Sequence, residues 1–207
     1  MNKLTNPLVI VANGTYPTHY VPLKILKEAS SILACDGAAN SLIENKFIPD
    51  LIIGDMDSIS KINKNKFDDR LVVIKDQSQN DLRKAINYAK DNNINSISII
   101  GATGKREDHM IGNIFSIQDY NELDIKIYTD NGIFTCIHKS QKVESFIGQQ
   151  VSLFSTDPTI KITSYNLMYN FNRSSINHLY RGTSNECTNN QFELKISHGS
   201  ITIFQQY

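Results

Sequence analysis

The chain has 207 residues, of which 40% are hydrophobic and 20% are charged, with 21 Lys+Arg against 21 Asp+Glu. This composition is ordinary for a soluble globular protein and provides enough apolar material for one large domain or two small ones. Because the formal net charge is +0, nothing in the overall charge favours binding to nucleic acid or to an anionic membrane. We therefore expect neither as a partner.

The first apolar run, Leu8–Ala12, is too short for a signal peptide and is more typical of a first strand. No run approaches the roughly 20 apolar residues that a membrane span requires. The cysteines, Cys35, Cys136 and Cys187, are scattered and lack CxxC spacing. This pattern argues against a zinc site or a disulfide framework and fits a reducing compartment, so we expect a cytoplasmic protein.

In the first two-thirds of the chain, short apolar runs alternate with helical patterns. Strands are expected at Leu8–Ala12, Ser31–Cys35, Leu51–Ile53, Leu71–Ile74, Ser96–Ile100 and Ile125–Tyr128. Between the fourth and fifth, Asp81–Asn92 has the apolar stripe of a half-buried helix, and Asn80 is a suitable N-cap. A second helix is expected from about Asp108 to Tyr120. This alternation predicts a parallel sheet with helices on both faces.

After about residue 135 the pattern changes to short β-prone segments separated by turns, and no further helix is expected. The segments are Gln141–Ser145, Gln150–Phe154, Thr159–Thr163, Gln191–Ser197 and Ser200–Phe204. We therefore predict an α/β domain over residues 1–135, followed by a small all-β sandwich domain over residues 136–207.

The most informative motif is Gly54-Asp55-Met56-Asp57-Ser58, which follows the third predicted strand. Residues two apart on an extended chain point the same way, so the two carboxylates can converge, and Asp81 at a helix start could add a third. Converging carboxylates require a cation, and Mg²⁺ prefers such oxygen ligands and often completes its shell with substrate phosphates. The motif predicts a magnesium site for phosphoryl chemistry. A solvated turn, and for Asp81 a favourable contact with the helix dipole, are the simpler alternatives.

Other candidate site residues also directly follow predicted strands. Open α/β sheets bind their ligands beyond the carboxyl ends of the strands, which is where these residues are expected. Asn13-Gly14 follows the first strand and Asp36-Gly37 the second. The first pair is also an ordinary turn signal, and Asp36 could simply be the N-cap of the next helix, so both alternatives stay open.

The segment Gly101–His109 follows the fifth predicted strand and is rich in glycine and charge. It is too short for a P-loop and has no hydroxyl residue after Lys105. Its glycines, a helix N-terminus and the cations Lys105 and Arg106 could still hold phosphate. We expect a functional role for Arg106 and Asp108, whereas His109 could equally be a packing residue. In the C-terminal part, the spacing of Arg181–Glu186 alone favours a hairpin turn.

In this order, the motifs resemble the thiamine pyrophosphokinase family. The matching segments are Asp36-Gly37-Ala38-Ala39-Asn40, Pro49–Ser58, Gln77 with Asp81, Gly104–His109 and Ser184-Asn185-Glu186. The resemblance spans nearly the whole chain. It implies an α/β nucleotide-binding domain followed by a β-sandwich, assembled as a homodimer. It also implies Mg²⁺-dependent transfer of the diphosphate of ATP to the hydroxyl of thiamine, with release of AMP.

The resemblance further implies roles for individual residues. Asp55, Asp57 and Asp81 would bind Mg²⁺ and, with Arg106 and Asp108, form the catalytic set. The residues that would bind the nucleotide are Asn13, Asp36, Gly37, Gly54, Ser58, Gly101, Thr103, Gly104, Lys105 and His109. Those that would hold thiamine are Gln77, Asp81, Ser184 and Asn185, the last two across the dimer interface. The chain departs from the family at Lys105, where many relatives have Gly, and at Cys187, where an aromatic residue is common.

Three other functions fit parts of the same pattern. A haloacid-dehalogenase-like phosphatase shares the strand-then-DxD pattern, but this chain lacks that family's late acidic pair. A relative with another alcohol acceptor, such as a pterin, would have a similar nucleotide half. The remaining alternative is a non-catalytic nucleotide- or thiamine-binding relative, although binding alone needs fewer acids than Asp55, Asp57 and Asp81.

Overall fold

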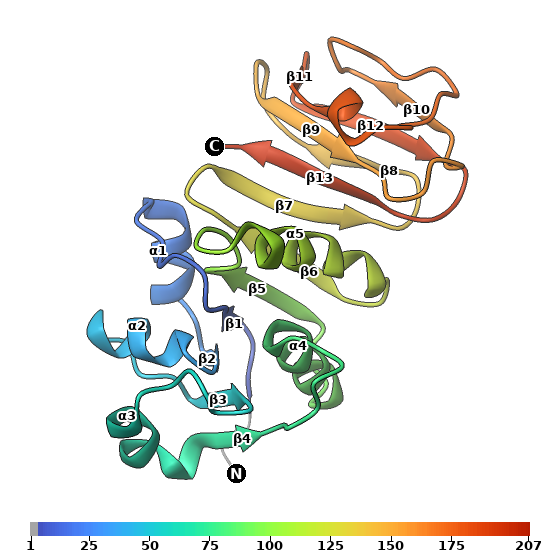
Figure 1. Cartoon of the computed structure of the whole chain (residues 1–207). Coiled ribbons are helices and arrows are strands. Elements are labelled where there is room, and N and C mark those ends of the chain that lie inside the picture. Colours follow the sequence, from blue (N-terminus) through green and yellow to red (C-terminus); the bar gives the residue numbers. More distant parts are fainter. Residues whose placement is uncertain (1–3) are drawn as a thin grey trace. The chain divides into compact units, whose positions relative to one another are not determined.

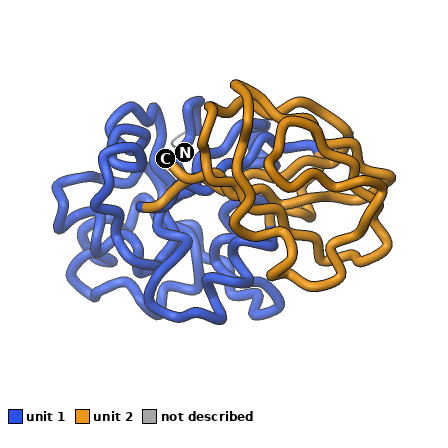
Figure 2. The backbone as a smooth tube through the Cα atoms, turned by 90° about the horizontal axis from the view of Figure 1, so that it is seen from above, with its two compact units in different colours: residues 1–116, 122–130 blue, residues 117–121, 131–207 orange. Residues whose placement is uncertain are grey.

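The structure is a computed structural model that describes residues 4–207. The chain forms two compact units (Figure 2). Unit 1 contains the chain up to Ser116 together with Glu122–Asp130, and unit 2 contains Ile117–Asn121 and Asn131–Tyr207. Within residues 4–207, no helix has both the length and the apolar character needed to cross a membrane.

Unit 1 is an α/β domain (Figure 1). Its strands are β1 Leu8–Val11, β2 Ser31–Cys35, β3 Leu51–Gly54, β4 Leu71–Val73, β5 Ser96–Ile100 and β6 Asp124–Tyr128. Its helices are α1 Tyr20–Lys27, α2 Ala38–Glu44, α3 Lys61–Lys66, α4 Asp81–Asp91 and α5 Glu107–Ser116, with a short 3₁₀ turn at Asp68–Arg70. All six strands predicted for this region are present; β2 and β5 have the predicted ends, and each of the other four differs by one residue at one end.

The strands of unit 1 are parallel and lie in the order β6-β5-β1-β2-β3-β4. The chain moves outward from β1 to β4 and then crosses back to place β5 on the other side of β1. The order therefore reverses between β1 and β5, which is where open α/β sheets form a ligand crevice beyond the carboxyl ends of their strands.

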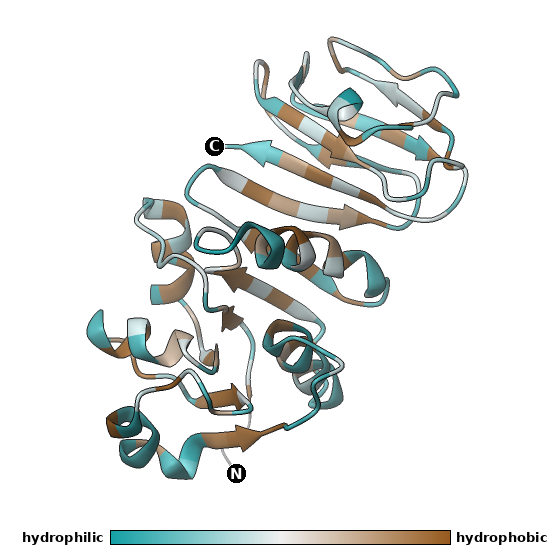
Figure 3. Cartoon of the chain, viewed as in Figure 1, coloured by the Kyte–Doolittle hydropathy of each residue, from teal (hydrophilic) through white to brown (hydrophobic). Residues whose placement is uncertain are grey.

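Alternating side chains divide the core of unit 1 between two faces of the sheet. On one face, Val9 and Ala34 belong to a buried cluster with Leu26 of α1 and Leu42 of α2. The residues between them in the strands point to the other face, where α4 packs against β1, β2 and β3. Figure 3 shows the resulting apolar character of β1 and β3. The parallel sheet is thus covered by helices on both faces, as the sequence predicts.

The predicted start of α4 is confirmed, because the side chain of Asn80 accepts a hydrogen bond from the backbone of Arg83 at 2.9 Å and caps the helix. The second predicted helix is shorter than expected. α5 ends at Ser116, and Ile117–Asp119 tightens into a 3₁₀ turn. Such tightening is common at the C-terminus of a helix.

Unit 2 is a β-sandwich whose sheets are both antiparallel. One has the order β11-β9-β13-β7 and the other β10-β12-β8. The strands are β7 Gly132–Ile137, β8 Gln141–Glu144, β9 Gln150–Phe154, β10 Ile162–Tyr165, β11 Asn185–Glu186, β12 Gln191–Ile196 and β13 Ile201–Gln206. A 3₁₀ turn spans Leu179–Gly182. Both sheets contribute to one core, for example Leu153 and Ile203 from the first and Ile162 and Phe192 from the second.

Three strands of unit 2 differ from the sequence-based expectation. β11 lies in the segment where the spacing alone favours a hairpin turn, but its residues pair with β9. β7 was not expected, because its segment lacks a clear alternation of apolar and polar residues; long-range pairing with β13 forms it. The strand expected at Thr159–Thr163 begins later, at Ile162. Both the backbone and the hydroxyl of Thr159 instead donate hydrogen bonds to Asp157, which closes a turn before the strand.

Candidate functional site

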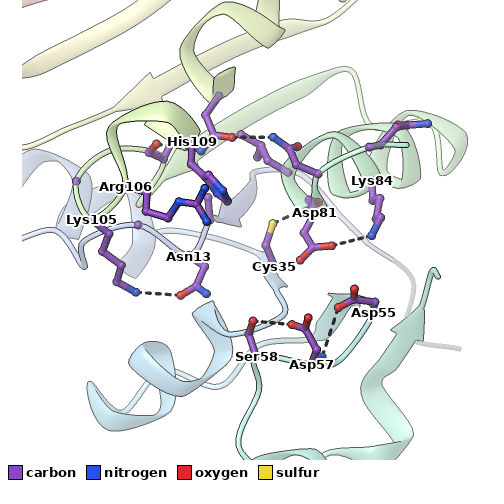
Figure 4. Close-up of a pocket in the computed structure, with 18 of the residues that line it drawn as sticks. Asn13, Cys35, Asp55, Asp57, Ser58, Asp81, Lys84, Lys105, Arg106 and His109 are labelled. Atoms are coloured by element: carbon purple, nitrogen blue, oxygen red, sulfur yellow. Dashed lines mark hydrogen bonds and ion pairs between the residues drawn. The ribbon is translucent and has the colours of Figure 1, made fainter. Parts of the chain in front are cut away.

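A cavity of about 490 Å³ lies in unit 1, beyond the carboxyl ends of β1, β2, β3 and β5 (Figure 4). One side of it is acidic, formed by Asp55, Asp57 and Asp81. Lys105 and Arg106 of the glycine-rich loop after β5 line it as well. The cavity therefore brings carboxylates from β3 and α4 together with the cations of the β5–α5 loop.

Three carboxylates converge at the end of β3. Oxygen atoms of Asp36, Asp55 and Asp57 all lie within 4.8 Å of one another. Asp55 Oδ2 accepts a hydrogen bond from Gln77 Nε2 at 2.9 Å, and Asp57 Oδ1 accepts one from the hydroxyl of Ser58 at 2.7 Å. The hydrogen bond from Gln77 is the main reason that the pKa of Asp55 lies below its ordinary value. Asp55 is therefore held as a carboxylate facing its two acidic neighbours.

Asp36 is almost completely buried and organises the loop that bears the other two acids. Its Oδ2 accepts a hydrogen bond from the backbone N–H of Ser58 at 3.0 Å, and its Oδ1 accepts one from Ile59 at 2.9 Å. Burial raises the pKa of its carboxyl, while these two bonds lower it. The alternative that Asp36 caps the next helix is wrong. The N-cap of α2 is Gly37, and no side chain caps that helix.

Asp81 is the first residue of α4, and its Oδ1 lies 3.0 Å from Nζ of Lys84. Its Oδ2 lies beside Gly54, the last residue of β3, where an added Cβ would be only 3.1 Å away. Gly54 has a φ of +152°, which side chains rarely adopt. Glycine at this position therefore leaves room for Asp81 to approach the end of β3.

The loops after β1 and β5 are joined by backbone hydrogen bonds, Gly14 N–H to Gly101 at 2.7 Å and Thr15 N–H to Thr103 at 2.8 Å. A Cβ on Gly14 would lie 2.3 Å from the carbonyl oxygens of both Gly101 and Thr103, so only glycine allows this approach. The pairing places Asn13, at the end of β1, on the same cavity as the β5–α5 loop.

The cations of the β5–α5 loop have partners within unit 1. Lys105 Nζ donates to Asn13 Oδ1 at 3.0 Å, and Arg106 pairs with Asp108 at 2.6 Å. The side chains of Arg106 and Asp108 are 71% and 63% exposed. The hydrogen bond from Arg106 lowers the pKa of Asp108 to about 2. Since these partners, Asn13 and Asp108, are exposed polar groups, an anion in the cavity can compete for Lys105 and Arg106.

Most of the site residues expected from the sequence come together here. Those that line the cavity are Asn13, Asp55, Asp57, Ser58, Gln77, Asp81, Gly104, Lys105, Arg106 and His109. The other expected residues are near this lining in sequence but are not part of it: Asp36, Gly37, Gly54, Gly101, Thr103 and Asp108.

Ser184 and Asn185 lie in unit 2, at β11. Asn185 is buried, and its side-chain amide accepts from the backbone N–H of Tyr169 at 3.1 Å and donates to the Tyr169 carbonyl at 2.8 Å. The backbone N–H of Ser184 donates to the hydroxyl of Ser152 at 3.2 Å. Asn185 therefore fixes the segment around Tyr169.

Sequence reasoning missed Lys84 and Asn113, which also line the cavity. Asn113 accepts a hydrogen bond from the side chain of Asn80 at 3.1 Å and donates to the carbonyl of Ala102 at 3.0 Å, so it links α4 to the β5–α5 loop. Of these two residues, only Lys84 has a feature in the sequence that could have indicated its place in the site. It follows Asp81 by three residues and adjoins the apolar stripe of the helix, an unusual place for a lysine.

The donor set suits magnesium. Oxygen ligands from a small number of carboxylates are what Mg²⁺ takes from proteins, and here such oxygens converge without a nitrogen or sulfur ligand in the cluster. Of the three, Asp36 already uses both oxygens on backbone donors. Asp55 and Asp57 are thus the better placed direct ligands, with Asp81 nearby across Gly54.

The chain is similar to known proteins along most of its length. Residues 23–129 match the family model described as thiamin pyrophosphokinase, catalytic domain, and residues 132–204 match thiamin pyrophosphokinase, substrate-binding domain. Thiamine pyrophosphokinase 2 of Arabidopsis thaliana is 28% identical over 168 residues, which cover 69% of this chain and 62% of that protein. Thiamine pyrophosphokinase 1 of rice is 25% identical over 202 residues, covering 82% of this chain and 75% of that one.

Solved structures share the fold. Thiamine pyrophosphokinase from Bacillus subtilis superposes with a TM-score of 0.81 at 20% identity, covering 96% of this chain and 98% of that one. The enzyme from Candida albicans gives 0.77 at 18% identity, covering 96% and 89%. With the two family models matching in order, one over each unit, the chain belongs to the thiamin pyrophosphokinase family.

Proposed function

We propose that this protein is a Mg²⁺-dependent thiamine diphosphokinase, which transfers the diphosphate of ATP to the hydroxyl of thiamine and releases AMP. The observation that supports this most strongly is the single cavity in which Asp55, Asp57 and Asp81 lie together with Lys105 and Arg106. A polyphosphate with its metal needs both parts, carboxylates for the cation and fixed cations for the remaining negative charge.

Asp55 and Asp57, with Asp81, would hold Mg²⁺, which when bound would neutralise phosphate charge and orient the phosphates. Gln77 keeps Asp55 in place through its hydrogen bond. Asp36 keeps the loop of Asp57 in place through two backbone bonds. The acids are thereby positioned before any ligand arrives, which limits the reorganisation needed during the reaction.

Arg106 and Lys105 would stabilise the charge on the transferred group and on the leaving AMP. For this they must exchange or share their present partners, Asp108 and Asn13. The loop glycines and the N-terminus of α5 add backbone donors. Asp57 or Asp81 would accept the proton of the thiamine hydroxyl as the new O–P bond forms.

The remaining assignments rest on the family. We propose that unit 1 binds ATP and that unit 2 takes part in thiamine binding and in forming a homodimer. Gln77 would contact thiamine, and so would Ser184, with Asn185 shaping the adjacent segment through its bonds to Tyr169. A cytoplasmic location is part of the same proposal, and the free thiols of all three cysteines are consistent with it.

The test is AMP formation by the purified protein with ATP and Mg²⁺, with and without thiamine. Asp57→Ala removes an acid of the cavity, and Asp91→Ala serves as the control because Asp91 ends α4 and does not line the cavity. We expect thiamine-dependent AMP with an equal amount of thiamine diphosphate, lost in Asp57→Ala and kept in Asp91→Ala. AMP or phosphate formed without thiamine would indicate another acceptor or a hydrolase. Bound nucleotide without turnover would favour a non-catalytic relative.

A further inference from the structure

The two buried charged side chains of unit 1 belong to the same site. Among residues 4–207, only Asp36 and Lys84 are charged and buried, at 1% and 5% exposure. Asp36 is explained by its bonds to the loop of Asp57. Lys84 has no part in the proposed chemistry, although burying an ammonium group is costly unless it is paired.

Lys84 is held on the inner side of α4. Its Nζ lies 3.0 Å from Asp81 Oδ1, and its side chain also lines the cavity, as Figure 4 shows. Lys90, six residues later on the same helix, pairs with Glu122 at the surface, and its side chain is 48% exposed. Lys84 thus differs from an ordinary helix lysine in being fixed beside the acids of the site.

Lys84 engages one of the two carboxylate oxygens of Asp81. Oδ1 contacts Lys84, whereas Oδ2 lies beside Gly54, the last residue of β3 and the one that precedes Asp55 in the chain. Lys84 also lines the same cavity as Asp55 and Asp57, so its charge acts on these carboxylates as well. A fixed positive charge so close to converging carboxylates opposes the binding of another cation.

We propose that Lys84 is a positioning residue that holds Asp81 by one oxygen and balances part of the acid charge, so that the site takes up its divalent cation together with the nucleotide and not before it. This inference rests on the proposed function. With Lys84 beside them, Asp55, Asp57 and Asp81 carry too little net negative charge to hold the cation tightly by themselves. The phosphates of the nucleotide supply the remaining negative charge.

The experiment measures Mn²⁺ binding by electron paramagnetic resonance, with and without a non-hydrolysable ATP analogue. The variants are Lys84→Met and Lys84→Gln, which remove the charge, and Lys84→Arg, which keeps it. Lys90→Met is the matched control, because it removes a paired lysine of the same helix outside the cavity. Circular dichroism establishes which variants are folded.

Without nucleotide, we expect Lys84→Met and Lys84→Gln to bind Mn²⁺ about tenfold more tightly than the unaltered protein. We expect Lys84→Arg and Lys90→Met to match the unaltered protein, and the enhancement of Mn²⁺ binding by the analogue to shrink in the neutral variants. The value of kcat should fall in these variants more than the KM for ATP rises, because Asp81 has lost its anchor.

Unchanged or weaker Mn²⁺ binding in a folded neutral variant would overturn the inference, and would leave Lys84 with a purely structural role. The proposed function fails in a different way, by the absence of thiamine-dependent AMP in the unaltered protein. The metal measurement remains informative in that case, because it reports the charge balance of the acids without turnover.

Discussion

Replacement of Asp36 by alanine is expected to disable the acid group indirectly, by releasing the loop that bears Asp57. The change removes the acceptor of two backbone N–H groups, those of Ser58 and Ile59. Ile59 is buried, so its N–H would be left without a partner, at a cost of about 1–3 kcal/mol. Ser58 is exposed and its N–H can turn to water, at a smaller cost.

Part of this loss is offset, because burial raises the pKa of Asp36 and the alanine relieves the protein of a desolvated charge. The net destabilisation should therefore be about 1–3 kcal/mol. For a chain of this size, each 1 kcal/mol lowers the unfolding temperature by about 2–4 °C. The larger effect should be on function, because Asp55 and Asp57 lose the geometry that lets their oxygens converge.

The assay combines thermal unfolding by circular dichroism with Mn²⁺ binding in the presence of an ATP analogue. Asp50→Ala is the control, since Asp50 also accepts a backbone hydrogen bond, from Ile32 at 2.8 Å, but does not line the cavity. Both variants should unfold at lower temperature, and only Asp36→Ala should lose metal affinity, by at least about tenfold. Normal metal affinity in a destabilised Asp36→Ala protein would refute the reasoning.

Three further predictions concern the same site. Gly54→Ala places a methyl group 2.9 Å from Cβ of Asp36 and 3.1 Å from Oδ2 of Asp81, at a φ of +152°; we expect a loss of about 1–3 kcal/mol in stability and of most AMP formation, and full activity would show that this close approach is not needed. The pKa of Asp108 is held at about 2, below the ordinary value of 3.8, so its pairing with Arg106 should favour the folded state above about pH 4 and vanish as the pH falls through about 2. Carbon NMR of the Asp108 carboxyl should show this low midpoint, which Arg106→Gln should move back up; an unshifted midpoint in the unaltered protein would contradict the pairing. Finally, EDTA should abolish thiamine-dependent AMP formation, and Mg²⁺ should restore it, whereas turnover in EDTA would exclude the proposed metal requirement.

The elements with strong local signals could be predicted from sequence. The parallel strands are short apolar runs, and α4 combines an apolar stripe with the N-cap Asn80, so local chemistry and the final fold agree. Because parallel strands end at one edge, the same reasoning also brought Asp55, Asp57 and Arg106 to one cavity. Strand β7 could not be predicted in this way, because its local sequence has no clear strand pattern. It forms through its pairing with β13, which is distant in the sequence.

The supporting residues of the site could not be predicted in the same way. The role of Asp36 depends on where the loop after β3 returns, which no local pattern specifies, and the helix-cap alternative was therefore equally reasonable. A lysine in a helix usually lies at the surface. Lys84 is buried beside Asp81 only because α4 packs on the sheet, which the local sequence does not reveal. Catalytic residue types are visible in a sequence, whereas the groups that orient them depend on tertiary contacts.

The central claim is that the transferred unit is a diphosphate. The most direct test supplies ATP labelled with ¹⁸O in its γ-phosphate, together with thiamine and Mg²⁺, and follows the products by mass spectrometry. The account predicts labelled thiamine diphosphate and unlabelled AMP in equal amounts. Formation of ADP with labelled thiamine monophosphate, or of labelled phosphate alone, would contradict it.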